Sequence, residues 1–171
     1  MKRQLFLLAG LWVSLSGAAI AQQAPAKAQS PKLTLDQDLI RSVQKDGKTV
    51  EERVPAPSAV LPGSVLIEEV TAQNQEKKVL NTVRISVPVP RNTQYLGSAT
   101  PSGERWKTQF TALCSGKALP YAEAPLNCTE TVDGKSVTRD VLPSEYVGVR
   151  WVLANMKSDE TLKLSFRVKV N

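Results

Sequence analysis

The chain has 171 residues, with 22 Lys and Arg against 16 Asp and Glu, so its formal net charge is +6. It contains two cysteines and no histidine, which excludes Ser-His-Asp and Cys-His catalysis and leaves too few ligands for a zinc site. Beyond residue 21, Lys77-Lys78 is the single adjacent basic pair. Because nucleic-acid binding needs a basic cluster on one face, we expect no nucleic-acid partner.

The N-terminus has the pattern of a secretory signal peptide. Lys2 and Arg3 precede an apolar run over 5–15, and Ala19 and Ala21 occupy the two positions that a signal peptidase recognises before its cleavage site. A retained membrane anchor is the alternative, but an anchor needs about 20 apolar residues, and polar side chains interrupt this run earlier. The pattern predicts cleavage after residue 21.

Cleavage would leave a mature chain with two parts. Residues 22–31 are rich in Ala, Gln and Pro, which is typical of a flexible leader, and residues 32–171 have the length of one domain. No later apolar run is long enough to span a membrane. We therefore expect export to the periplasm, the cell surface or the medium.

Strands are predicted along the first two thirds of the domain. The segment Leu33–Val43 is interpreted as a strand, although its apolar residues could also line a helix face. Further strands are expected over Val65–Ala72, 82–89 and Trp106–Leu113. Pro88 and Pro90 cannot donate ladder hydrogen bonds, so the strand over 82–89 should lie at a sheet edge or leave the sheet there.

Two Asp-Gly pairs predict tight hairpin turns. Asp46-Gly47 and Asp133-Gly134 both stand between β-prone flanks, and each is followed by a proline segment. The flanking sequences do not match, so we interpret them as two independent hairpins that protrude from one domain, in preference to a duplication.

Cys114 and Cys128 are an even count of cysteines in a chain with an export signal. A disulfide between them is the expectation for an oxidising compartment. In the chain-entropy model, closing a loop of this size contributes about 3 kcal/mol.

The C-terminal third shows the clearest alternation of apolar and polar residues. The segment 146–153 is predicted to be a strand. One face carries Val147, Val149, Trp151 and Leu153, and the other face carries Tyr146, Gly148 and Arg150. A second strand over Leu162–Val170 alternates in the same way, and the short link over 155–159 predicts that the two strands pair as a hairpin. The predicted core contains Trp151, Phe166, Leu164, Val149, Val87 and Ile85.

Six or more short antiparallel strands with almost no helix predict an all-β fold, a single immunoglobulin-like sandwich. The sequence makes no prediction of its oligomeric state, or of whether the N-terminal hairpin pairs with the main sandwich.

The carboxylates offer no reactive constellation. Glu51-Glu52 and Glu68-Glu69 are adjacent pairs, and neighbours on a strand point to opposite faces. Asp36 and Asp38 share a face, but two carboxylates alone make a poor calcium site. We assign no catalytic, cofactor or metal residues.

Three segments resemble the conserved repeat domain of bacterial surface proteins (domain of unknown function eleven). Leu61-Pro62-Gly63-Ser64-Val65 with Asn74 is similar to its opening, 87–99 (VPVPRNTQYLGSA) to its central stretch, and 143–151 with 162–170 to its closing strands. The resemblance covers 55–171 and implies an extracytoplasmic immunoglobulin-like module without catalytic residues. Ser64, where the family has Asp, and the segment between the two cysteines depart from the pattern.

These observations favour a non-enzymatic module of the cell envelope or surface, with a structural, adhesive or interaction role and an envelope protein or surface polymer as partner. A periplasmic binding or chaperone-like module that acts by strand addition is the alternative. A hydrolase that uses carboxylates alone would need two distant carboxyl groups to converge in a cleft.

Overall fold

The computed structural model describes residues 30–171, which form eleven β-strands and one 3-10 turn. The signal peptide and all but the end of the leader predicted from the sequence lie outside the described residues. The elements are β1 (Lys32–Lys45), β2 (Lys48–Pro55), β3 (Val65–Gln73), β4 (Leu80–Pro88), β5 (Thr93–Gly97), β6 (Trp106–Cys114), β7 (Lys117–Ala118), β8 (Asn127–Val132), β9 (Lys135–Asp140), η1 (Pro143–Glu145), β10 (Tyr146–Met156) and β11 (Thr161–Val170). No helix in this part of the chain has the length and apolar character needed to cross a membrane.

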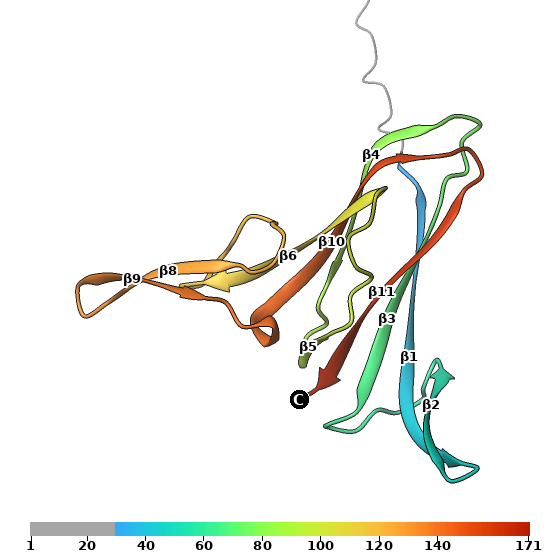
Figure 1. Ribbon diagram of the computed structural model, residues 1–171, viewed down its shortest axis with the longest axis horizontal. Coiled ribbons are helices and arrows are strands. Elements are labelled where there is room, and N and C mark those ends of the chain that lie inside the picture. The colour runs from blue at the N-terminus through green and yellow to red at the C-terminus, as the bar shows by residue number, and fades with distance from the viewer. Residues whose placement is uncertain (1–29) are drawn as a thin grey trace, which may run out of the picture.

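Two antiparallel sheets pack face to face (Figure 1). The first has the strand order β2-β1-β3-β11-β5 and the second has the order β4-β10-β6-β7. Strands β8 and β9 form a separate two-stranded ribbon. The fold is therefore the all-β, immunoglobulin-like sandwich that the alternation predicts, and the N-terminal strand is part of it because β1 pairs with β3.

The core lies between the inner faces of the two sheets. Trp151 of β10 and Phe166 of β11 face each other across it, with 6.4 Å between their ring centroids. The Trp151 indole N–H donates to the Thr100 carbonyl oxygen at 3.0 Å, so the loop after β5 is tied to the core. All six core residues named from the sequence are buried: Trp151, Phe166, Leu164, Val149, Val87 and Ile85.

The predicted hairpin between the two C-terminal strands is wrong. Strand β10 pairs with β4 and β6, whereas β11 pairs with β3 and β5 in the other sheet. Alternation shows that each strand has one apolar face, but it does not distinguish strands that lie side by side from strands that face each other.

The link between them crosses from sheet to sheet at a polar corner. The buried Asn74 amide donates to the carbonyl oxygens of Lys78, Met156 and Lys157 at 2.8, 3.2 and 2.7 Å. Its backbone N–H donates to the Glu160 carbonyl oxygen at 2.9 Å. Asn74 therefore holds together two of the corners at which the chain changes sheet, the one between β3 and β4 and the one between β10 and β11.

The expected outward orientation of Tyr146 is also wrong. The register of β10 against β6 shifts between Tyr146 and Gly148, and this bulge turns the Tyr146 ring into the core, where it stacks on Phe110 at 4.9 Å. Val147, expected inside, is half-buried. A bulge adds one residue to a strand, so the alternation before it is inverted relative to the alternation after it.

The other strand expectations are confirmed. The segment interpreted as strand or helix around Leu39 is the strand β1. Strand β4 ends at Pro88 and lies at the edge of its sheet, as the missing proline N–H requires.

Two hairpins project from the sandwich (Figure 1). The β1–β2 hairpin turns at Asp46-Gly47 and the β8–β9 hairpin turns at Asp133-Gly134. All four turn residues have positive φ, between 50° and 76°, which is the conformation that a two-residue type I′ turn requires.

Candidate interaction site

The first part of β1 is a sheet edge within the described residues. Strand β3 pairs with β1 from Lys32 to Ile40, but β2 pairs with it only from Asp38 onward. The segment Lys32–Gln37, called the β1 edge below, therefore has one side without a neighbouring strand in residues 30–171. Its unpaired backbone N–H and C=O groups are a template for another strand.

The inner face of the β1 edge is apolar and open. Leu33 and Leu35 lie opposite Ala72 and Val70 of β3, on the face that forms the core further along β1. They are nevertheless 48% and 54% exposed, whereas Leu39 on the same face is 8% exposed. The sandwich therefore covers the inner face of β1 at Leu39 but leaves it open at its start.

The outer face of the β1 edge carries charges of both signs. Lys32, Thr34 and Asp36 alternate with the two leucines and are exposed. Neither Lys32 nor Asp36 forms an ion pair within residues 30–171. Lys163 lies near Asp36, but its ammonium group bonds Glu69 at 2.8 Å.

Strand β4, the edge of the other sheet, is a poorer template. Pro88 has no N–H to offer, and Thr82 has a φ of 53°, which is unusual for a β-branched residue. The inner side chains Val83 and Ile85 are already buried and offer no open apolar surface. Proline and irregular backbone often protect natural edge strands from pairing. The β1 edge contains neither a proline nor a residue with positive φ.

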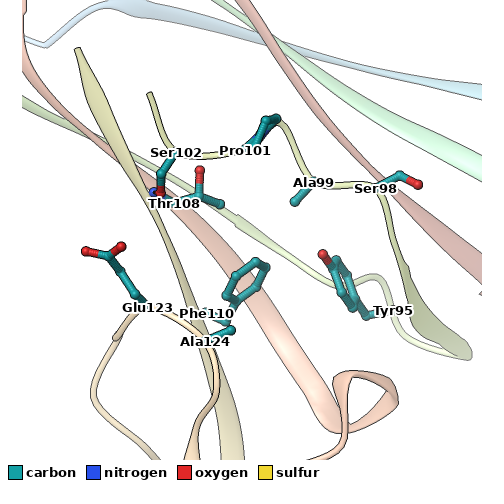
Figure 2. A pocket seen from close by; sticks show the side chains of 9 residues that line it. All are labelled: Tyr95, Ser98, Ala99, Pro101, Ser102, Thr108, Phe110, Glu123 and Ala124. Atoms are coloured by element: carbon teal, nitrogen blue, oxygen red, sulfur yellow. The ribbon is translucent and has the colours of Figure 1, made fainter. Parts of the chain in front are cut away.

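A hollow of about 360 Å³ opens between the loop after β5 and strand β6 (Figure 2). Its walls come from Tyr95, Ser98, Ala99, Pro101, Ser102, Thr108, Phe110, Glu123 and Ala124. Tyr95 and Phe110 meet edge to face at 5.7 Å. Burial raises the pKa of the Tyr95 hydroxyl above its usual value.

The polar groups of the hollow are largely used by the protein itself. The Thr108 backbone N–H donates to the Ser102 hydroxyl at 2.9 Å, and the Thr108 hydroxyl donates to the Thr100 carbonyl oxygen at 2.8 Å. Glu123, the one carboxylate among the described lining residues, lies 3.7 Å from the Lys107 ammonium group. These contacts hold the loop against β6 and leave few groups to recognise a ligand.

Ion pairs on the outer face attach the β1–β2 hairpin to the first sheet. The Arg167 guanidinium of β11 donates to both carboxylate oxygens of Glu51 on β2, at 2.9 and 2.6 Å. Glu69 of β3 accepts from Lys163 at 2.8 Å and from Arg53 at 3.1 Å. Strands β1 and β3 separate β2 from β11 in the sheet order, so the hairpin bends across this face.

These contacts shift carboxylate pKa values downward. The hydrogen bonds from Arg167 hold the pKa of Glu51 below its usual 4.5. Lys163, and after it Arg53, do the same for the pKa of Glu69. Both carboxylates therefore stay ionised, and the attachment stays complete, throughout the neutral range.

The β8–β9 hairpin is attached by a disulfide and an arginine. Cys128 of β8 is bonded to Cys114 at the end of β6, with 5.5 Å between their Cα atoms. Arg139 of β9 donates to Glu130 at 3.1 Å and to both carboxylate oxygens of Glu145 at 2.9 Å. The predicted disulfide is thus present, and it joins this hairpin to the second sheet.

The adjacent glutamates on β3 diverge, as expected for neighbours on a strand. Glu68 is buried and accepts a hydrogen bond from Gln37, while Glu69 faces outward. Burial raises the pKa of Glu68, and the Gln37 bond opposes that shift. Asp36 and Asp38 share the outer face, and no cluster of three potential metal ligands occurs in residues 30–171.

The β1 edge was not predicted from the sequence, although the sequence contains an indication of it in the turn and the prolines of the β1–β2 hairpin. The Asp46-Gly47 turn sets the pairing of Lys45 with Lys48 and hence of Asp38 with Pro55. Pro55 and Pro57 then stop β2, because proline cannot donate to a ladder. Within residues 30–171, the hairpin itself therefore leaves the β1 residues before Asp38 without a strand neighbour on the side opposite β3.

No protein-family model matches this chain, and no curated protein or solved structure shows significant similarity to it.

Proposed function

We propose that this protein is an exported, non-enzymatic interaction module of the cell envelope, and that it binds another polypeptide through the β1 edge. The open inner face at Leu33 and Leu35, beside unpaired backbone groups, is the observation that carries the proposal. The N-terminal signal pattern and the Cys114–Cys128 disulfide support an oxidising location outside the cytoplasm.

A polypeptide fits the β1 edge better than a surface polysaccharide does. The unpaired groups are backbone donors and acceptors at strand spacing, which an added strand satisfies with its own backbone. The two leucines repeat at every second residue, so they match the side chains on one face of such a strand. A sugar chain would leave both leucines largely uncovered.

The test is site-specific photo-crosslinking in intact cells. A photoreactive side chain in place of Thr34 should capture a polypeptide, because Thr34 is exposed and lies next to the midpoint of the β1 edge. The matched control carries the same side chain in place of Leu142, which is also exposed but lies at the start of η1, and should capture nothing. Recovery of the protein in the cytoplasm, or no product at residue 34, contradicts the proposal.

A chaperone-like module is a second candidate, because a free edge can also accept an unfolded client strand. It predicts that the protein suppresses aggregation of an unfolded envelope protein and that Leu35→Lys abolishes this effect. A dedicated interaction module would give one discrete crosslinked product in place of many.

A further inference from the structure

We propose that the polypeptide bound at the β1 edge is a second copy of this chain, so that two five-stranded sheets join edge to edge in a symmetric dimer. This inference rests on the proposed function and specifies its partner. It follows from the width of the β1 edge and from the order of its side chains.

The unpaired window has a natural centre. Pro31, which cannot donate to a ladder, stands at one end, and the Asp38–Pro55 pair closes the other. The midpoint between these limits falls between Thr34 and Leu35, so a two-fold axis near the middle of the window passes through one of these two residues. An axis at Thr34 places Thr34 opposite Thr34 of the second copy, and such a self-complementary contact is the commonest form of dimer interface.

In this register the apolar positions match. Leu33 of one copy lies opposite Leu35 of the other, and the reverse contact follows from the symmetry. All four leucines are on the inner face, because residues directly opposite in an antiparallel pair share a face. The open apolar surface of each copy would thus be covered by that of its partner.

The charged positions match as well. Lys32 of one copy lies opposite Asp36 of the other, on the outer face, and this pair also occurs twice. Opposite charges at facing positions stabilise strand pairing, whereas like charges destabilise it. Both residues are free of ion pairs within the described chain, so each is available to its partner.

Neighbouring registers do not have this match. A shift of one residue turns the leucines of one copy to the outer face. With the axis at Leu35, Lys32 would face Asp38, whose backbone already pairs with Pro55 of β2. With the axis at Leu33, Lys32 would face Thr34, and both ion pairs would be lost.

Charge reversal tests the dimer in the mature protein. Sedimentation should show a monomer–dimer equilibrium. Lys32→Glu or Asp36→Lys should weaken dimerisation by about tenfold, because each variant replaces two attractive pairs with two repulsive ones. The double variant Lys32→Glu with Asp36→Lys exchanges the charges and should restore the wild-type dissociation constant.

Cysteine crosslinking tests the register. Facing Cα atoms in an antiparallel pair lie about 4.5–5.5 Å apart, which suits a disulfide, so Thr34→Cys should form a disulfide-linked dimer on mild oxidation. Asp36→Cys, on the same face of the same strand, lies opposite Lys32 and should remain monomeric on a non-reducing gel after the same oxidation, whereas reductant should return the Thr34→Cys dimer to monomer.

The outcomes separate this inference from the proposed function. A protein that stays monomeric at every concentration, or a dimer that Lys32→Glu leaves unchanged and Thr34→Cys does not crosslink, overturns the dimer. If the crosslink at residue 34 in cells then joins a different polypeptide, the proposed function stands. If the protein dimerises through the β1 edge but fractionates with the cytoplasm, the dimer stands and the envelope role fails.

Discussion

The two hairpins have the same turn sequence and different attachments. Asp46-Gly47 and Asp133-Gly134 adopt the same left-handed conformation, and each closes a two-stranded ribbon. The β1–β2 hairpin is attached to the first sheet by Glu51, which pairs with Arg167 of β11, and by Arg53, which pairs with Glu69 of β3, and its first strand continues into that sheet. The β8–β9 hairpin is a separate ribbon, attached by a disulfide and by Arg139.

This difference shows that a local turn determines a hairpin but not how the hairpin is attached to the rest of the fold. Exposed ion pairs each contribute little and respond to pH and salt. A disulfide responds to redox conditions and restricts the unfolded chain as well. We therefore expect the two hairpins to loosen under different conditions.

Truncating a side chain of the core that both sheets share should destabilise the whole domain, and therefore both hairpins equally. This variant has the largest expected effect on stability. Trp151→Ala deletes a buried ring and its bond to Thr100, and should lower the free energy of unfolding by about 3–5 kcal/mol. Denaturant unfolding measures the loss, and amide exchange should accelerate in β2 and β9 alike. Leu142→Ala, at an exposed position, is the control and should be close to neutral; a neutral Trp151 variant would place the ring outside the core.

Removing the disulfide should affect the β8–β9 hairpin first. The double variant Cys114→Ala with Cys128→Ala should lose about 3 kcal/mol and show faster amide exchange in β8 and β9 than in β2. Thermal unfolding with and without reductant gives the measurement. Reductant should reproduce the shift in the wild-type protein and change nothing in the variant, and equal melting of wild type in both conditions would contradict the disulfide's role.

Removing one arginine at a time should separate the two attachments with a smaller effect. Arg167→Met frees Glu51, so amide protection should fall in β2 and remain in β9. Arg139→Met should do the reverse, and by less, because the disulfide still holds β8. Hydrogen exchange read by NMR compares both hairpins in one sample; equal losses in both would mean that they are not independent.

Acid should loosen the β1–β2 hairpin by the smallest amount. Because the pKa values of Glu51 and Glu69 are lower in the folded state than their usual 4.5, their contribution to stability is complete above about pH 4.5 and is lost as the pH falls through the folded-state values. Carboxyl NMR titration measures both pKa values. Arg167→Met should return the pKa of Glu51 toward 4.5, and a wild-type Glu51 that already titrates at 4.5 would contradict the ion pair.

Several parts of the fold were accessible from local sequence. The alternation around Ile85 and Trp151 identified strands and their buried sides, because the side chains of a strand alternate with a period of two. The Asp-Gly pairs identified the turns, because few residues tolerate positive φ. The cysteine count identified the disulfide.

The candidate site was less accessible. Leu33 and Leu35 look in sequence like any other inward-facing pair, and nothing in their own segment says whether a second sheet lies above them. The proline stop after β2 indicates a missing strand neighbour, but only once the hairpin register is known.

Local sequence predicted most of the strands, the apolar face of the regular ones and the positions of the two hairpin turns, because these properties depend on neighbouring residues. The tertiary arrangement was needed to establish that β10 and β11 lie in opposite sheets, that Tyr146 turns inward at a bulge and that the β1 edge has one side without a strand neighbour within residues 30–171. Those properties depend on which distant strands meet, and an apolar face can be buried by a strand from either sheet, or left open for a second molecule.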